Sequence, residues 1–239
     1  MGHFYLQSLS ISHFTQLVCA GTLVFYLASL REKTKAVWWA LSFAVFGFIL
    51  ISFEFISSSV WYAPWAHLLN WLSVLPEAGL VISLVQFAYV FPVADEGWTK
   101  EASWGLRFSL VAYIVVAIYI SYNYYAEFNN LDSFWRGDWR LTVVVIHFLW
   151  GMITAGRQLW RWSRTAAPGA AWYWHWWRPA GRPAQSAQRL LSIFGVLVVG
   201  YATLLLFEIN GRWYDLIISV TVIIALVAFY LVLLNDLPA

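Results

Sequence analysis

Four ionisable side chains interrupt otherwise apolar runs of this sequence, and they are the residues best placed to do chemistry. They are Glu54, Glu77, His147 and Glu208. A charged group inside a bilayer costs several kcal/mol unless it is paired or neutralised. Glu77 is the clearest case, because it lies near the middle of the run at residues 69–92, LNWLSVLPEAGLVISLVQFAYVFP. Its presence predicts a partner.

His147 is the predicted partner of Glu77. A helix rises about 1.5 Å per residue, so position along an apolar run estimates depth. Glu77 and His147 each lie about nine or ten residues from the same predicted side of the membrane. We therefore expect the two side chains to face each other. A histidine–carboxylate pair would also respond to protons, because histidine titrates near neutral pH.

Polar residues recur at helical spacing around these groups. Asn70, Ser73 and Glu77 lie three and four residues apart and share one helical face. Lipid cannot satisfy polar groups, so such a face is expected to line the bundle interior or a wet cavity. Pro76 removes a backbone donor, which predicts a bend and a freed carbonyl near Leu72.

These patterns predict a polar pocket in the outer half of the membrane that binds a small ligand or a proton. Its expected residues are Glu54, Asn70, Trp71, Glu77, His147, Tyr201 and Glu208. A purely structural role stays open, because single polar side chains often form hydrogen bonds between membrane helices.

The elements that must position these residues follow from composition. Of the 239 residues, 62% are hydrophobic and 11% are charged, whereas soluble domains carry about 25% charged residues. Apolar runs of about 20 residues are each long enough to cross a bilayer. We therefore predict an all-α, polytopic membrane bundle forming a single domain, residues 1–239. The seven predicted helices are 10–30, 36–59, 67–91, 105–127, 138–161, 189–209 and 214–235.

The distribution of basic residues predicts the orientation. Cytoplasmic loops carry the excess of Lys and Arg. One predicted side holds eleven of the 14 basic residues and the other holds Arg136, Arg140 and Arg212. This places the N-terminus outside and the C-terminus in the cytoplasm, in a bacterial inner membrane.

The predicted cytoplasmic loop 162–188 combines aromatic and basic residues. Such a segment favours either anchorage in the lipid headgroup layer or docking of another protein. The residues that carry this prediction are Trp172, Trp174, Trp176, Trp177 and Arg178.

Several functions are disfavoured. Retinal needs a lysine inside the bundle, and the lysines are Lys33, Lys35 and Lys100, none of them in the last helix. Two facing histidines at equal depth would be needed for a b-type haem. No catalytic or metal-binding motif appears, so no enzyme activity, metal or nucleic-acid partner is expected. No cofactor is assigned, although haem and quinone stay open.

The end of the third predicted helix, LVQFAYVFP at residues 84–92, resembles the seven-helix N-terminal sensor region of bacterial histidine kinases and nucleotide or diguanylate cyclases. Gln86-Phe87 stands where that family commonly has His-Phe, and Phe91-Pro92 matches its ending. The terminal YLVLLNDLPA resembles the family's junction with an effector. The resemblance implies an input module that signals to a cytoplasmic effector domain or partner protein, with a homodimer left open. The chain contains no kinase or cyclase domain.

The leading hypothesis is a receptor-like sensor in which a ligand shifts the last three helices by an ångström or two, a change that requires unequal affinity for two arrangements. The alternative is a non-catalytic membrane subunit of a respiratory or photosynthetic complex. There, the aromatic residues would pack against other subunits, quinones or pigments.

Overall fold

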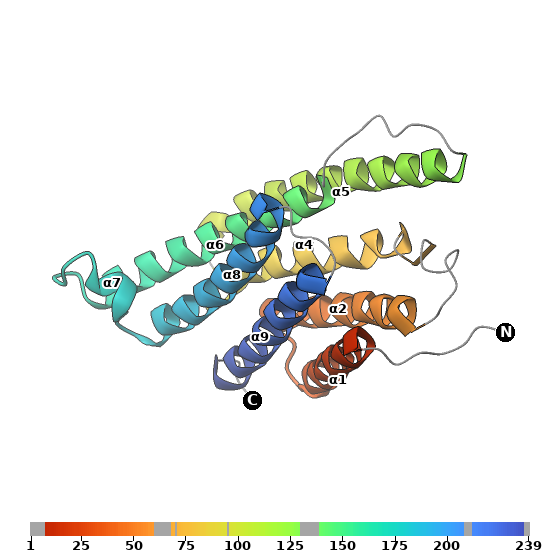
Figure 1. Ribbon diagram of the computed structural model, residues 1–239. Coiled ribbons are helices and arrows are strands. Elements are labelled where there is room, and N and C mark those ends of the chain that lie inside the picture. Colours follow the sequence, from red (N-terminus) through yellow and green to blue (C-terminus); the bar gives the residue numbers. More distant parts are fainter. Residues whose placement is uncertain are drawn as a thin grey trace.

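The computed structural model describes residues 8–59, 68–69, 71–94, 96–129, 139–207 and 212–236, and all regular structure in these ranges is helical (Figure 1). The helices are α1 (Ser8–Ser29), α2 (Lys35–Ser59), α4 (Val74–Val90), the 3-10 helix η1 (Glu96–Trp98), α5 (Thr99–Phe128), α6 (Trp139–Ala166), the short α7 (Trp174–Trp177), α8 (Arg182–Phe207) and α9 (Arg212–Asp236).

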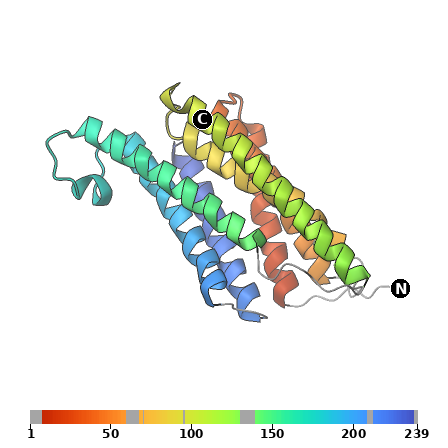
Figure 2. The ribbon, with the colours of Figure 1, turned by 90° about the horizontal axis from the view of Figure 1, so that it is seen from above.

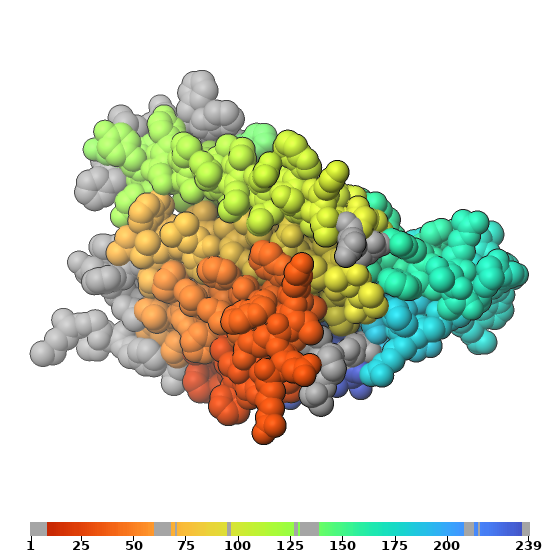
Figure 3. All heavy atoms as spheres, turned by 180° about the vertical axis from the view of Figure 1, so that it is seen from behind, coloured from red at the N-terminus to blue at the C-terminus, as the bar shows by residue number. Residues whose placement is uncertain are grey.

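Six helices form a closed ring. Around it, α1 packs on α2, α2 on α4, α4 on α6, α6 on α8, α8 on α9, and α9 returns to α1. Helix α5 lies outside the ring against α4 and α6, and Figure 3 shows it along the surface of the molecule. Neighbouring helices of the ring run antiparallel except for the parallel pairs α4–α6 and α9–α1. We name the two ends of the ring after the chain termini. The amino-terminal end holds Ser8 and Ser59, and the carboxy-terminal end holds Lys35 and Asp236.

The helices identify an integral membrane protein. Six of those described are long and apolar enough to span a bilayer, namely α1, α2, α5, α6, α8 and α9. Helix α4 is equally apolar in character but has 17 residues. Large apolar side chains on α5, such as Val111, Ile114 and Ile118, are about 60% exposed and suit contact with lipid.

Helix ends differ from the predicted ones mainly at the carboxy-terminal end. Helix α5 begins at Thr99 instead of 105, α6 continues to Ala166 instead of 161, and α8 begins at Arg182 instead of 189. The helices thus run past their apolar stretches into polar sequence. In Figures 1 and 2, α7 and the adjoining ends of α6 and α8 lie at one extremity of the molecule.

Small residues allow close helix contacts. A β-carbon at Gly79 of α4 would collide with the Phe46 ring of α2, and one at Gly151 of α6 would collide with the Phe194 ring of α8. Glycine at both positions lets an aromatic ring pack directly on backbone, as is common between membrane helices.

Pro76 lies in the first turn of α4, where the helix tolerates a proline. Ser73, the residue directly before α4, has a turn conformation. Helical hydrogen bonds nevertheless continue through it, because Ser73 N donates to Leu69 O and Glu77 N donates to Ser73 O. The helical path thus continues through Ser73, and the bend and freed carbonyl near Leu72 stay predictions.

Candidate functional site

A cavity of about 880 Å³ lies inside the helix ring, toward its amino-terminal end. Residues of α1, α2, α4, α6, α8 and α9 line it, and the last part of α5 contributes Tyr119, Asn123 and Tyr124. Small-molecule sites commonly enclose about 300–1,000 Å³. The size of this cavity fits such a site.

The lining changes from polar to apolar along every helix of the ring except α1. On α4 Glu77 is followed inward by Leu80, Val81 and Leu84. On α6 Arg140 is followed by Leu141, Val144 and Phe148, and on α9 Tyr214 is followed by Ile218, Val222 and Phe229. Spacings of three and four residues put each set on one helical face. The cavity thus has a polar end and an apolar interior.

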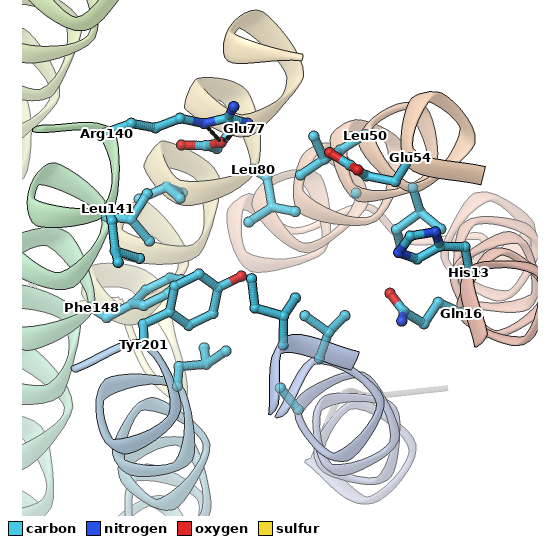
Figure 4. Close-up of a pocket in the computed structure, with 18 of the residues that line it drawn as sticks. His13, Gln16, Leu50, Glu54, Glu77, Leu80, Arg140, Leu141, Phe148 and Tyr201 are labelled. Carbon is cyan, nitrogen blue, oxygen red and sulfur yellow. Dashed lines mark hydrogen bonds and ion pairs between the residues drawn. The ribbon is translucent and has the colours of Figure 1, made fainter. Parts of the chain in front are cut away.

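An ion pair closes the polar end between α4 and α6. Arg140 donates from Nε and Nη2 to Oε2 of Glu77, and its Nη2 also donates to Ser73 Oγ at 2.9 Å. The side chains of Arg140 and Glu77 are 23% and 11% exposed. Figure 4 shows the pair on one wall of the cavity. Arg140 is therefore the residue that neutralises the Glu77 carboxylate in this apolar segment.

Further polar groups face this pair. In Figure 4, Glu54 of α2 and His13 and Gln16 of α1 lie on the wall next to Leu50, and Tyr201 of α8 lies beside Phe148. The Phe148 and Tyr201 ring centroids are 5.3 Å apart. Glu54 and Glu77 both lie within electrostatic range of Arg140 and of Tyr201. We call Glu54, Glu77, Arg140 and Tyr201 the cavity cluster.

Hydrogen bonds tie α1 to α2 at the same end. Ser10 Oγ donates to the Ser58 carbonyl at 2.9 Å, and His13 Nδ1 lies 3.1 Å from Ser58 Oγ. Ser58 Oγ donates to Phe55 O, so the serine oxygen accepts from the His13 ring. These bonds fix His13 at the cavity wall.

The predicted pairing of Glu77 with His147 is wrong. His147 is 1% exposed and does not line the cavity. Its Nδ1 lies 2.7 Å from the Val143 carbonyl, which can only accept, so Nδ1 carries the proton. Its Nε2 then accepts from Ser109 Oγ of α5 at 2.9 Å. A neutral His147 is satisfied on both nitrogens, which makes it a hydrogen-bonding link between α5 and α6.

The other predicted ligand-binding residues fall into two groups. Glu54, Trp71, Glu77 and Tyr201 all line the cavity. Asn70 and Glu208 lie outside the described residues. Sequence reasoning missed Arg140, His13, Gln16 and Tyr214. Arg140 was counted among the basic residues that predict the orientation, not among the ligand-binding residues.

The aromatic loop is folded more tightly than the sequence suggested. His175 of α7 is buried, its Nδ1 lies 3.0 Å from Ser163 Oγ, and Ala180 N donates to the same oxygen at 3.2 Å. Gln188 Nε2 donates to Trp176 O at 2.7 Å. The aromatic side chains around His175 point outward and are 38–78% exposed: Trp172, Tyr173, Trp174, Trp176 and Trp177. Arg178 stacks over Trp174.

A second polar network, which we call the Glu101 network, joins α4, α5 and α6 at the carboxy-terminal end. Arg157 donates to both Glu101 oxygens at 2.6 and 3.2 Å. Tyr89 Oη donates to Glu101 Oε1 at 2.9 Å and accepts from Trp150 Nε1. Gln158 Nε2 donates to the Ala88 carbonyl at 2.8 Å. Each group here bonds a neighbouring helix.

The residues behind the family resemblance pack in this same region. Phe87 and Phe91 are stacked and buried, Phe87 contacts Phe229 of α9, and Gln86 Nε2 donates to the Ala102 carbonyl of α5. Packing between helices accounts for these residues without a ligand.

Comparisons with family models, with curated proteins and with solved structures each found no match to this chain.

Proposed function

We propose that this protein is a receptor-like membrane sensor whose ring of helices binds a small ligand in the cavity and transmits the bound state to a cytoplasmic effector. The observation that carries the proposal is the cavity itself, about 880 Å³ bordered by the ring helices and the last part of α5, with the cavity cluster at its polar end. Buried charged groups beside an apolar chamber favour a binding site over helix packing alone.

Helix α9 is the element we propose to carry the signal. Its cavity-facing residues run from Tyr214 to Phe229, which is a path of about 22 Å along the helix. Phe229 contacts Phe43 and Phe87 at centroid distances of 4.8 and 5.2 Å. A ligand beside α9 is therefore in contact with a helix that continues to Asp236 at the opposite end.

The basic residues support an arrangement in which the cavity faces the outside. The carboxy-terminal end of the ring carries Arg157, Arg161, Arg164 and Arg178, so we propose that this end is cytoplasmic. Signalling then requires that the ligand bind one arrangement of α6, α8 and α9 more tightly than another. A tenfold preference corresponds to about 1.4 kcal/mol.

Filling the cavity tests the proposal. Val222 of α9 lines the cavity, whereas Val220 on the same helix is 48% exposed and faces away. Val222→Trp mimics occupancy, and Val220→Trp is the matched control. Spin labels at Leu234→Cys on α9 and Ser103→Cys on α5, both exposed, would report helix position in a Cys19→Ala background.

We expect Val222→Trp to shift the distance distribution between the labels and Val220→Trp to leave it unchanged. Identical distributions in both variants would show that cavity occupancy does not reach the end of α9. That result would refute the sensor proposal.

A further inference from the structure

Two neighbouring helices mark the membrane boundary at the carboxy-terminal end of the ring. The apolar stretch of α6 ends at Gly156, directly before Arg157. The apolar stretch of α8 begins at Leu190, directly after Arg189. These two points lie side by side, because a β-carbon at Gly156 would be 3.9 Å from Leu191 Cδ1. Both helices thus change from apolar to basic sequence at one level, where the hydrocarbon core is expected to end. We call it the boundary level.

Helix α7 folds back to the boundary level. The Trp176 ring lies against Gly156, with 3.5 Å between Trp176 Cη2 and the position that a β-carbon would take there. Trp160, one turn further along α6, contacts the rings of His175 and Trp176 at centroid distances of 5.3 and 6.1 Å. The connection between α6 and α8 therefore brings α7 back to the membrane surface.

The aromatic rings of residues 172–178, which we call the α7 segment, are presented outward from a fixed backbone. Hydrogen bonds from His175 to Ser163 and from Gln188 to the Trp176 carbonyl hold the segment on α6 and α8. Trp172 and Trp177 are 69% and 78% exposed. Exposed apolar patches of this kind mark contact surfaces. Tryptophan rings at this depth suit the headgroup layer, where the ring is covered and its N–H meets water.

The charge around the α7 segment is positive. Residues 158–190 contain five arginines and no acidic residue. Arg164, Arg178 and Arg182 are exposed. The whole end keeps this sign, because its eleven basic residues outnumber every acidic residue on or beside its segments, namely Glu32, Asp95, Glu96, Glu101 and Asp236. Arginine clusters directly beside a membrane helix attract anionic lipid headgroups.

We propose that the α7 segment binds anionic phospholipid in the bilayer that the ring spans, with its exposed rings among the headgroups and the neighbouring arginines on the phosphates. The boundary level favours a lipid surface over a protein partner, because the rings lie beside the end of the apolar stretch and not beyond it. This assignment is independent of what occupies the cavity.

Tryptophan quenching tests the depth of the α7 segment, with the full chain in phosphatidylcholine nanodiscs. The emission lost in Trp172→Phe, Trp177→Phe is the contribution of these two rings among the 17 tryptophans. We expect phospholipid brominated close to the headgroup to quench this contribution, and aqueous iodide to leave it. Thr165→Trp is the matched control, because Thr165 is exposed on α6 about 13 Å beyond Gly156. The emission that it adds should be quenched by iodide.

The same two rings report the preference for negative charge. Brominated phosphatidylglycerol should quench them more than brominated phosphatidylcholine at an equal mole fraction in the discs. Arg164→Gln with Arg178→Gln should lower the local enrichment of phosphatidylglycerol about fivefold for each arginine. Arg31→Gln with Lys35→Gln is the matched control and should keep the preference, because these exposed residues lie between α1 and α2, away from α7 in Figures 1 and 2.

Iodide quenching of the two rings without quenching by brominated lipid would refute the proposal and leave the α7 segment as a water-facing surface for a protein partner. Equal quenching by the two brominated lipids would overturn the anionic assignment. An equal loss of preference in both charge variants would assign the effect to the net charge of the whole end and not to the α7 segment. The comparison of the two lipids on the unaltered arginines still decides the headgroup class if a charge variant does not fold.

Discussion

Helix α6 contributes the arginine of two arginine–glutamate ion pairs, one near each end. The two pairs have the same residue types but differ in burial and surroundings. Arg140 meets Glu77 of α4 beside the cavity, with side chains 23% and 11% exposed. Arg157 meets Glu101 of α5 at the other end, with side chains 46% and 40% exposed. Burial makes the first pair costly to break, whereas solvent weakens the second.

The surroundings of the two pairs point to different roles. Glu101 also accepts from Tyr89, and Arg157 stacks over Trp98 with a guanidinium–ring distance of 4.8 Å. These contacts bind α4, α5 and α6 into one unit. The cavity cluster instead has an 880 Å³ space next to it. Similar residues therefore lock helices at one end and border a binding volume at the other.

The largest expected effect concerns which end faces the cytoplasm. Gly169 and Asn129 are exposed near opposite ends of the ring. In a Cys19→Ala background, an impermeant maleimide applied to intact cells should label Asn129→Cys and leave Gly169→Cys unlabelled. Both should react after the cells are opened. Labelling of Gly169→Cys alone would reverse the orientation and place the cavity on the cytoplasmic side.

Breaking the buried pair is the next largest effect. Arg140→Gln should destabilise the protein by about 3–5 kcal/mol, because it leaves the buried Glu77 carboxylate without its guanidinium partner. Glu77→Gln should cost less, because Glu54 remains within electrostatic range of Arg140. The double variant should lose less than the sum of the single losses, because the residues are coupled. Unfolding of the protein in nanodiscs by graded addition of denaturing detergent would measure these differences.

His147 is the control for that coupling. Its ring bonds Val143 and Ser109 instead of Glu77. Glu77→Gln and His147→Gln should therefore be additive within about 0.3–0.5 kcal/mol. Strong coupling between Glu77 and His147, with additivity between Glu77 and Arg140, would contradict the arrangement of the cavity cluster.

Sequence patterns predicted the membrane bundle and a few of the polar residues that line the cavity for a clear physical reason. Bilayer thickness sets the length of apolar runs, and polar residues on such runs must turn inward. Glu54, Glu77 and Tyr201 were found in this way. The partner of Glu77 was not predicted correctly, because the depth of a residue along a helix does not reveal which way the helix is rotated about its axis. His147 faces α5, while Arg140 reaches back to α4.

Helix ends at the carboxy-terminal end could not be read from hydropathy either. The predicted helix 138–161 already contains Arg157 and Arg161, but α6 continues past Arg161 to Ala166. Glu101 and the Trp98 ring give these arginines partners on the neighbouring segments. Such contacts join residues far apart in the chain, and no local sequence pattern predicts them.

The smallest expected effect belongs to the half-exposed pair. Arg157→Gln should cost about 0.2–1 kcal/mol for the ion pair and about 0.5–1 kcal/mol for the contact with Trp98. Arg164→Gln is the matched control, because Arg164 lies exposed on the same helix and no ion pair is seen for it among the described residues.

Salt separates the two pairs further. Charges that face water are screened within about 8–10 Å at physiological ionic strength, whereas buried charges are screened much less. The cost of Arg157→Gln should therefore shrink toward that of Arg164→Gln as salt is raised, while the cost of Arg140→Gln persists. An Arg157→Gln loss that equals the Arg140→Gln loss and resists salt would mean that the Glu101 network is as buried in the membrane as the cavity cluster. The contrast between the two ends of α6 would then fail.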